Sequence, residues 1–209
     1  DERLPLVRDL CISYLGKDPV KEPIPIRPVV HYMMGGIHTD VKAATRLPGL
    51  FAAGECACVS INGANRLGSN SLTELLVFGK RAALSAMEHI QSGLPASTDA
   101  ALASQAQASE ARIDALMKKS NGTETIAGLR KEMMDTMETN VGIYRTGSEL
   151  ATACDKISEL RQRYANIALH DKTHVYNTDL MQALELGSML DCAEAVTVGA
   201  RDRKESRGA

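Results

Sequence analysis

Aromatic residues are scarce in this sequence: tryptophan is absent, and aromatic residues make up only 3% of the 209 residues. Stacking of bases on aromatic rings is therefore not expected to dominate ligand binding. The sequence also lacks an excess of positive charge, since its net charge is −2. Because a basic stripe or a strong basic excess is typical of nucleic-acid binding, we predict no nucleic-acid partner.

Long apolar runs are missing as well, so no segment reaches the roughly 20 apolar residues of a membrane-spanning helix. The first residues, DERLPLVRDL, show no signal-peptide pattern, and the five cysteines are scattered and odd in number. These features favour reduced thiols and an intracellular protein. The C-x-C pair Cys56 and Cys58 and the i, i+4 pair His170 and His174 lack further ligands nearby. We therefore expect no bound metal.

The residues that are present divide the sequence into three parts, with enough hydrophobic content (44%) for a real core. Residues 1–28 form a short helix ending at Gly16 and then a connector with four prolines. Residues 29–96 combine short strands, glycines and one long helix. From residue 97 onward proline is absent, and apolar periodicity predicts helices at 98–119, 123–139, 147–169 and 178–198. The fold class that follows is α+β and mostly helical.

The stretch Asn62–Leu72, NGANRLGSNSL, places one arginine, Arg66, among small and polar residues just before the long helix. Small residues let a ligand approach the backbone, and a helix N-terminus attracts anions. The planar guanidinium of Arg66 suits a carboxylate or phosphate. Ser71 followed by Glu74 fits the capping-box pattern. The stretch is either an anion-binding turn or a polar loop with an ordinary cap and a surface arginine.

Two further stretches carry candidate ligand-binding residues. Val29–Asp40 has the pattern of a strand, a glycine pair and a second strand, with His31 placed before the glycines. Histidine can donate a hydrogen bond to an anionic substrate, although most isolated histidines are structural. Leu50–Ala53 is expected to be a buried strand, and Glu55 follows it after a glycine. An acid in that position either binds the hydroxyls of a ribose or ribityl chain or caps a turn.

These motifs together resemble the flavoprotein subunit of succinate dehydrogenase and fumarate reductase. HYMMGG, GLFAAGE and GANRLGSNSL occur in the order and spacing of that family. NVGIYRTGSEL (140–150) and ESRGA (205–209) are similar to its helical domain and to the start of its closing motif. L-Aspartate oxidase shares the fold and related motifs, but Gly68 and the helical half are more similar to the succinate and fumarate group. The resemblance covers nearly the whole sequence.

The resemblance implies a cofactor, a substrate and a role for five residues. His31 and Arg66 would bind the carboxylates of a four-carbon dicarboxylate, succinate or fumarate. Glu55 would bind the ribityl chain of FAD, and the backbone of Ser71 and Leu72 would contact the isoalloxazine ring. Hydride would pass between flavin and substrate. Electrons would be exchanged with quinone through an iron–sulfur subunit and membrane anchor subunits, which would hold the protein on the cytoplasmic, inner face of the membrane.

The sequence also departs from the family. No G-x-G-x-x-G opens a strand–turn–helix unit, so the family's pyrophosphate-binding motif is missing. The resemblance places the histidine of covalent FAD and the proton-donating arginine in the missing part, so we assign no catalytic residue here. We expect a portion of the subunit: a helix and connector (1–28), the C-terminal part of an FAD-binding α/β domain (29–96) and a helical domain (97–209). The alternatives are an L-aspartate oxidase-like flavoprotein or, for the chain alone, a non-catalytic helical interaction module.

Overall fold

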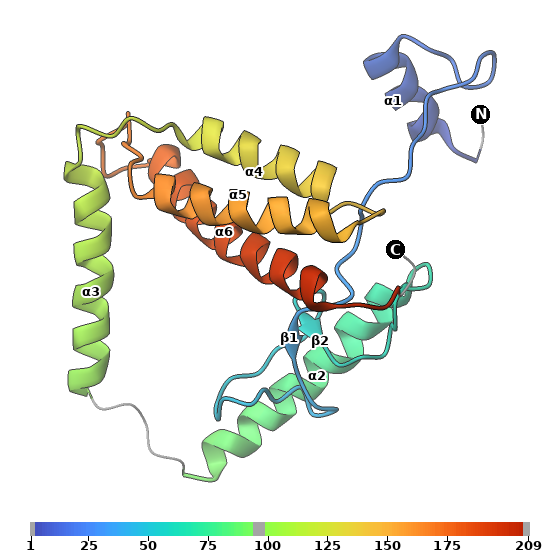
Figure 1. Ribbon diagram of the computed structural model, residues 1–209. Coiled ribbons are helices and arrows are strands. Elements are labelled where there is room, and N and C mark those ends of the chain that lie inside the picture. The colour runs from blue at the N-terminus through green and yellow to red at the C-terminus, as the bar shows by residue number, and fades with distance from the viewer. Residues whose placement is uncertain (1–2, 94–98, 207–209) are drawn as a thin grey trace. The chain divides into compact units, whose positions relative to one another are not determined.

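The computed structural model describes residues 3–93 and 99–206, and the chain separates into two compact units, Asp1–Val30 and His31–Ala209. Helices account for most of the structure, and a single two-stranded sheet accounts for the strands of the described residues (Figure 1). The predicted α+β, mostly helical fold is therefore confirmed. The further division of the second unit at residue 96 stays a prediction.

The first unit contains one helix, α1 (Pro5–Leu15). Proline fits the first helical turn because its missing N–H would have no partner there, and Gly16 ends the helix in the left-handed conformation with φ 66°. Arg8 holds the following turn, since its Nε and Nη2 donate to the Asp18 carboxylate at 3.1 and 2.8 Å. These hydrogen bonds lower the pKa of Asp18 to about 2. Of the side chains of this helix, only Cys11 is buried.

The second unit begins with a small parallel sheet made of β1 (Ile37–His38) and β2 (Ala57–Cys58). Gly36 precedes β1 with φ 138°, and a Cβ atom there would lie 2.5 Å from the carbonyl oxygen of Cys56. Only glycine allows the two backbones to meet at this distance. The strands are much shorter than the sequence predicted. The expected strand at 50–53 is wrong: it forms one antiparallel bridge, between Ala44 and Phe51.

The long helix α2 (Asn70–Gln91) follows the arginine-containing stretch. The predicted capping box is wrong, because the N-cap is Ser69, with φ 64° and no side-chain hydrogen bond to the helix. Glu74 is instead 5% exposed and turned toward residues from other segments. Apolar residues recur along α2 at helical spacing but are not covered: Leu72, Leu76 and Ile90 are 64%, 77% and 76% exposed. The helix ends at Gln91, and Gly93 follows with φ 70°.

Four helices form the rest of the unit: α3 (Asp99–Lys118), α4 (Ile126–Asn140), α5 (Gly147–Tyr164) and α6 (Thr178–Asp202). The last three pack side by side (Figure 1). Their core contains side chains that are almost completely buried. The core includes Leu129, Ile157, Leu160, Leu186 and Leu190. α5 ends five residues before its predicted end because the chain turns at 165–166, and Ile167 then pairs with Glu124.

Local sequence signals explain where the bundle helices start. Thr125 accepts a hydrogen bond from the N–H of Gly128 at the start of α4, and Asn177 accepts one from Leu180 at the start of α6. Thr146 and Glu149 form a complete capping box at the start of α5. Of the three methionines on α4, Met133 is buried and Met137 packs half-buried against the core, whereas Met134 is 56% exposed.

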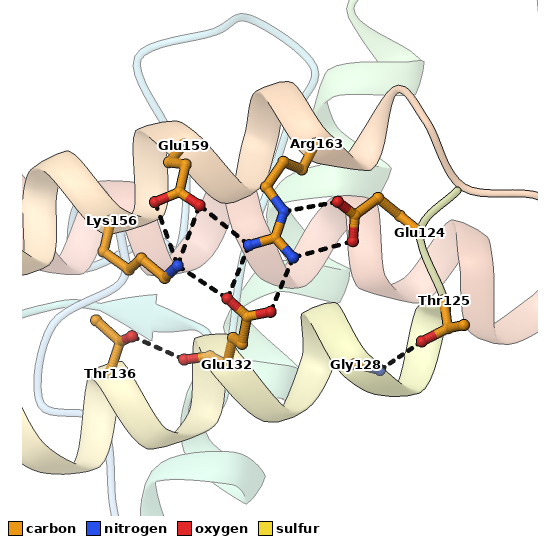
Figure 2. A network of polar contacts seen from close by, with 8 residues as sticks. All are labelled: Glu124, Thr125, Gly128, Glu132, Thr136, Lys156, Glu159 and Arg163. Carbon is orange, nitrogen blue, oxygen red and sulfur yellow. Dashed lines mark hydrogen bonds and ion pairs between the residues drawn. The ribbon is translucent and has the colours of Figure 1, made fainter. Parts of the chain in front are cut away.

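A polar network joins α4 to α5 (Figure 2). Arg163 on α5 forms two hydrogen bonds with Glu124 and two with Glu132, all between 2.8 and 2.9 Å. Lys156 also contacts Glu132, at 2.8 Å. Hydrogen bonds from Arg163 and Lys156 hold the pKa of Glu132 at about 2. The ion pairs thus fix how the two helices face each other on the solvent side of the core.

The loop before α4 passes close to the loop after α5 at a glycine. A Cβ atom at Gly122 would lie 2.5 Å from the carbonyl oxygen of Asn166 and 2.6 Å from the backbone nitrogen of Ala168. Because these neighbours are backbone atoms, they have little freedom to move aside. Gly122 therefore marks a close contact between two loops as well as the boundary before α4.

Candidate functional site

Arg66 meets the segment that contains His31. The guanidinium carbon of Arg66 lies 4.3 Å from the centre of the Tyr32 ring, which is a cation–π contact. The Tyr32 hydroxyl donates to Oε2 of Glu74 at 3.4 Å. The structure thus joins two of the motifs singled out in the sequence, the histidine segment and the arginine stretch, through the residue next to His31.

The hydrogen-bonding groups of Arg66 are only partly used. One terminal nitrogen donates to the carbonyl oxygen of Leu67 at 3.0 Å, whereas Nε is buried and has no hydrogen-bond partner. No ion pair to Arg66 is found among residues 3–93 and 99–206. A half-buried guanidinium without a carboxylate partner is suited to an external anion.

Glu74 is the buried acid of this region. Its Oε2 accepts from the Asn62 side chain at 2.8 Å as well as from Tyr32. Burial of Tyr32 and the negative charges of Glu74 and Glu55 raise the pKa of the Tyr32 hydroxyl. The hydroxyl therefore stays protonated and acts as the donor to Glu74 at neutral pH.

Glu55 is exposed and lies in the turn before β2, not at the end of a strand as expected. Gly54 turns the chain there with φ 88°, and a Cβ atom at this position would lie 2.6 Å from the Leu75 side chain. Oε1 of Glu55 accepts from the backbone N–H of Met33 at 3.3 Å. The carboxylate is thus close to the histidine segment and keeps acceptor capacity for hydroxyl groups.

The N-terminus of α2 carries the remaining two candidates. Ser71 is half-buried and Leu72 is 64% exposed, and both lie in the first turn. The N–H of Leu72 donates to the carbonyl oxygen of Ser69 at 3.1 Å. This turn has no acidic residue and no side-chain cap, so its partial positive charge is not neutralised locally.

His31 itself is exposed and lies at the start of the second unit. The chain then places Tyr32 on Arg66 and the N–H of Met33 on Glu55. The three residues 31–33 therefore connect the predicted substrate-binding side chains to the predicted ribityl-binding acid.

Sequence reasoning missed Tyr32, Asn62 and Glu74. Glu74 was assigned to a helix cap because its spacing from Ser71 fits a capping box. A signal was available in the run SLTELL, where a single acid interrupts an apolar stretch. An acid on a buried helical position needs donors from another segment, and the Tyr32 hydroxyl and the Asn62 amide are such donors.

Other candidates can be judged from the described parts of the chain. Residues 3–93 and 99–206 hold no group of three or more His, Cys, Asp or Glu side chains that could bind a metal, and His170 and His174 lie in a loop. None of the helices described here combines the length and apolar character needed to cross a membrane.

Comparison with known proteins covers the whole chain. Residues 1–72 match the family described as "FAD binding domain", and residues 130–209 match "Fumarate reductase flavoprotein C-term". A fumarate reductase flavoprotein subunit of Serratia is 50% identical over 208 residues, which are 100% of this chain and 34% of that protein. The chain is a relative of the fumarate reductase and succinate dehydrogenase flavoprotein subunits. The resemblance predicted from the sequence motifs is thereby confirmed.

Further relatives and solved structures agree. A succinate dehydrogenase flavoprotein subunit of Rickettsia bellii is 41% identical, over 99% of this chain and 36% of that protein. A chain of an Escherichia coli quinol fumarate reductase variant has 47% identity and a TM-score of 0.93, with 99% of this chain and 35% of that one covered. A chain of the Mycobacterium smegmatis Sdh1 complex has 37% identity and a TM-score of 0.86, with coverages of 99% and 34%. This chain spans about a third of the length of these relatives.

The described residues fit part of a flavin site. The α2 N-terminus has no side-chain cap and no acid in its first turn, which suits a negatively charged ring system. Glu55 offers exposed carboxylate oxygens of the kind that accept hydrogen bonds from sugar hydroxyls. Arg66 adds a half-buried guanidinium without a carboxylate partner among the described residues, which is suited to an anion.

Proposed function

We propose that this chain forms the dicarboxylate-binding portion, and part of the FAD-binding portion, of an oxidoreductase that interconverts succinate and fumarate. The observation that carries the proposal is Arg66: its guanidinium is stacked on Tyr32, lacks a carboxylate partner in the described residues and keeps a buried donor unpaired. It does so in a chain that is 50% identical to fumarate reductase flavoprotein subunits.

Arg66 and His31 are the substrate-binding residues of the proposal. A guanidinium binds a carboxylate through two parallel N–H donors and so fixes both its position and its plane. His31 donates to the second carboxylate of a four-carbon dicarboxylate. Two cationic or donor groups at opposite ends of the substrate hold its central carbons in one orientation, which is the main contribution of binding residues to rate.

Glu55, Ser71 and Leu72 serve the cofactor. FAD, when bound, supplies a two-electron acceptor and donor for hydride. Glu55 accepts hydrogen bonds from the ribityl chain while it also holds the N–H of Met33. Ser71 and Leu72 bring the positive end of the α2 dipole to the flavin, where it stabilises negative charge.

The whole protein is proposed to work in a complex. The similar solved structures include a quinol–fumarate reductase with menaquinol molecules and the Mycobacterium smegmatis Sdh1 complex. We propose an iron–sulfur subunit as electron partner and membrane anchor subunits that hold the protein at the inner face of the membrane. The relatives reported above favour this function over an L-aspartate oxidase-like one or a purely structural helical module.

The test is an Arg66→Lys variant of the full flavoprotein subunit that carries this sequence. Lysine keeps the charge but loses the planar fork. We expect kcat/KM for succinate, measured by dye reduction, to fall by about 100-fold or more while flavin content per protein is unchanged. Glu88→Gln on the exposed side of α2 is the matched control, with unchanged kinetics expected. A near-normal rate for Arg66→Lys would contradict the proposed role of Arg66.

A further inference from the structure

Tyr32 contacts Arg66, and Glu74 binds both Tyr32 and Asn62, yet none of these three belongs to the binding set proposed above. We infer that Glu74 is a positioning residue, which anchors the Tyr32 ring so that the ring holds the guanidinium of Arg66 in the orientation that receives a substrate carboxylate. This inference rests on the proposed function, since it assigns Arg66 to substrate binding. It adds a buried group that acts on the substrate only through its neighbours.

The anchor begins with Glu74 on α2. The side chain is 5% exposed, and one oxygen, Oε2, receives both the Asn62 amide at 2.8 Å and the Tyr32 hydroxyl at 3.4 Å. A buried carboxylate is costly unless donors satisfy it, so both donors are held toward it. Asn62 opens the arginine stretch, and Tyr32 belongs to the histidine segment. One carboxylate thus ties both motifs to the same helix.

Tyr32 transmits this anchoring to Arg66. The ring lies 4.3 Å from the guanidinium carbon, within the range of a cation–π contact. A phenol that donates a hydrogen bond to a carboxylate has a more electron-rich ring, which strengthens its attraction for a cation. Because Glu74 holds the ring at its hydroxyl end, the ring is kept in place beside Arg66. The guanidinium that stacks on the ring is positioned with it.

The state of Arg66 indicates that this arrangement prepares a ligand site. A purely structural arginine normally donates to carboxylates or several carbonyl oxygens. Within the described residues, Arg66 instead donates to the neighbouring Leu67 carbonyl, and its Nε is buried without a partner. Glu74 is close to the ring that holds Arg66, yet it makes no ion pair with Arg66 in the described residues. The acid orients the arginine without occupying its donors.

The test is a double-mutant cycle on dicarboxylate affinity in the full flavoprotein subunit with FAD bound. Succinate binding is measured at equilibrium through its perturbation of the flavin absorbance, and kcat and KM are measured separately. The variants are Arg66→Lys, Tyr32→Leu, which removes the aromatic face, and the two combined. Tyr32→Phe keeps the face and loses the anchor. Glu74→Leu and Glu74→Gln remove and retain an oxygen acceptor, respectively.

If Tyr32 acts through Arg66, its effect disappears once Arg66 is changed. We expect Tyr32→Leu to weaken succinate binding by about 3- to 30-fold in the wild-type background and by less than about 2-fold in the Arg66→Lys background. Tyr32→Phe should give a smaller loss than Tyr32→Leu, and Glu74→Gln a smaller loss than Glu74→Leu. Tyr144→Phe, on a side chain that is 84% exposed, is the control.

Three outcomes would overturn the inference or the function beneath it. Equal effects of Tyr32→Leu in both backgrounds would mean that Tyr32 does not act through Arg66. Equal losses for Glu74→Gln and Glu74→Leu would mean that the acceptor oxygen is not the anchor. Unchanged succinate affinity in Arg66→Lys would instead remove the proposed substrate role of Arg66. If Tyr32→Leu does not fold or load flavin, the same cycle with Tyr32→Phe decides, because the anchoring hydroxyl alone should couple to Arg66.

Discussion

The bundle α4–α6 and the lobe around α2 differ in how their apolar residues are used. In the bundle, leucines and isoleucines from three helices are almost fully buried against one another. On α2, only Glu74 and Phe78 are buried, and its leucines are largely exposed. The bundle is therefore stabilised by the burial of its own apolar side chains. Near α2, the buried Glu74 instead holds two polar side chains, those of Tyr32 and Asn62, in defined places.

The largest expected change in the free energy of unfolding comes from a substitution in the bundle core. Leu160→Ala removes a side chain that is 0% exposed, and we expect a loss of about 2–5 kcal/mol in the free energy of unfolding. Leu76→Ala on α2 removes one that is 77% exposed and should change it by less than about 0.5 kcal/mol. Urea unfolding followed by helical circular dichroism measures both. Equal losses would show that α2 is as well packed as the bundle.

A second prediction concerns the lobe alone. Glu55→Ala removes the acceptor for ribityl hydroxyls and the bond to the Met33 N–H. We expect FAD to dissociate about tenfold more readily in the full subunit, corresponding to about 1.4 kcal/mol, with succinate affinity unchanged in the flavin-loaded fraction. Flavin content and equilibrium binding measure the two quantities. A change in succinate affinity with normal flavin content would place Glu55 at the substrate instead.

A third prediction concerns how the α4–α5 network responds to acidic pH. The pKa of Glu132 is held at about 2 in the folded chain, against 4.5 without partners. The unfolded chain therefore takes up this proton first as pH falls, so the stabilisation is complete above about pH 5 and is lost progressively toward pH 2. Glu132→Gln should flatten the loss of unfolding free energy between pH 5 and 2. Asp135→Asn, in a solvent-exposed pair with Lys131, is the control and should change the slope less.

The smallest effect is expected at the helix starts. Thr125→Ala removes the cap bond to the N–H of Gly128 and should cost about 1 kcal/mol of unfolding free energy. Ser69 caps α2 without a side-chain bond, so Ser69→Ala removes no such interaction. Its hydroxyl therefore contributes nothing as a cap. Thermal unfolding of both variants, each compared with the unaltered chain, distinguishes a cap that stabilises its helix from one that does not.

The difference between the bundle and the region around α2 also determines how much of the structure the sequence could predict. The bundle helices follow from apolar spacing and from caps such as Thr146 with Glu149, because these signals lie within a few residues of one another. α5 was predicted too long because its end depends on a contact between Glu124 and the chain after the helix. Such a contact joins segments about 40 residues apart and leaves no local pattern.

In the lobe, the sequence motifs located the candidate residues but not their contacts. Arg66 and Glu55 were identified from their surroundings, and Tyr32 now links Arg66 to the histidine segment. The role of Glu74 was misassigned because a capping box and a buried acid share the same local spacing. Its true donors, Asn62 and Tyr32, are 12 and 42 residues away. Strands of two residues, as at 37–38, are likewise set by their partner and not by propensity.

Gly122 has a consequence for how variation in this protein should be interpreted. Any side chain there would collide with the backbone at 166–168, so replacements are expected to be removed by natural selection through failed folding and lowered abundance. The position would then look as invariant among descendants as a ligand-binding residue. Yet none of the groups its side chain would meet belongs to Arg66, Glu55 or the segment around His31. Invariance at this position would reflect the close contact between the two loops and would not indicate a binding or catalytic role.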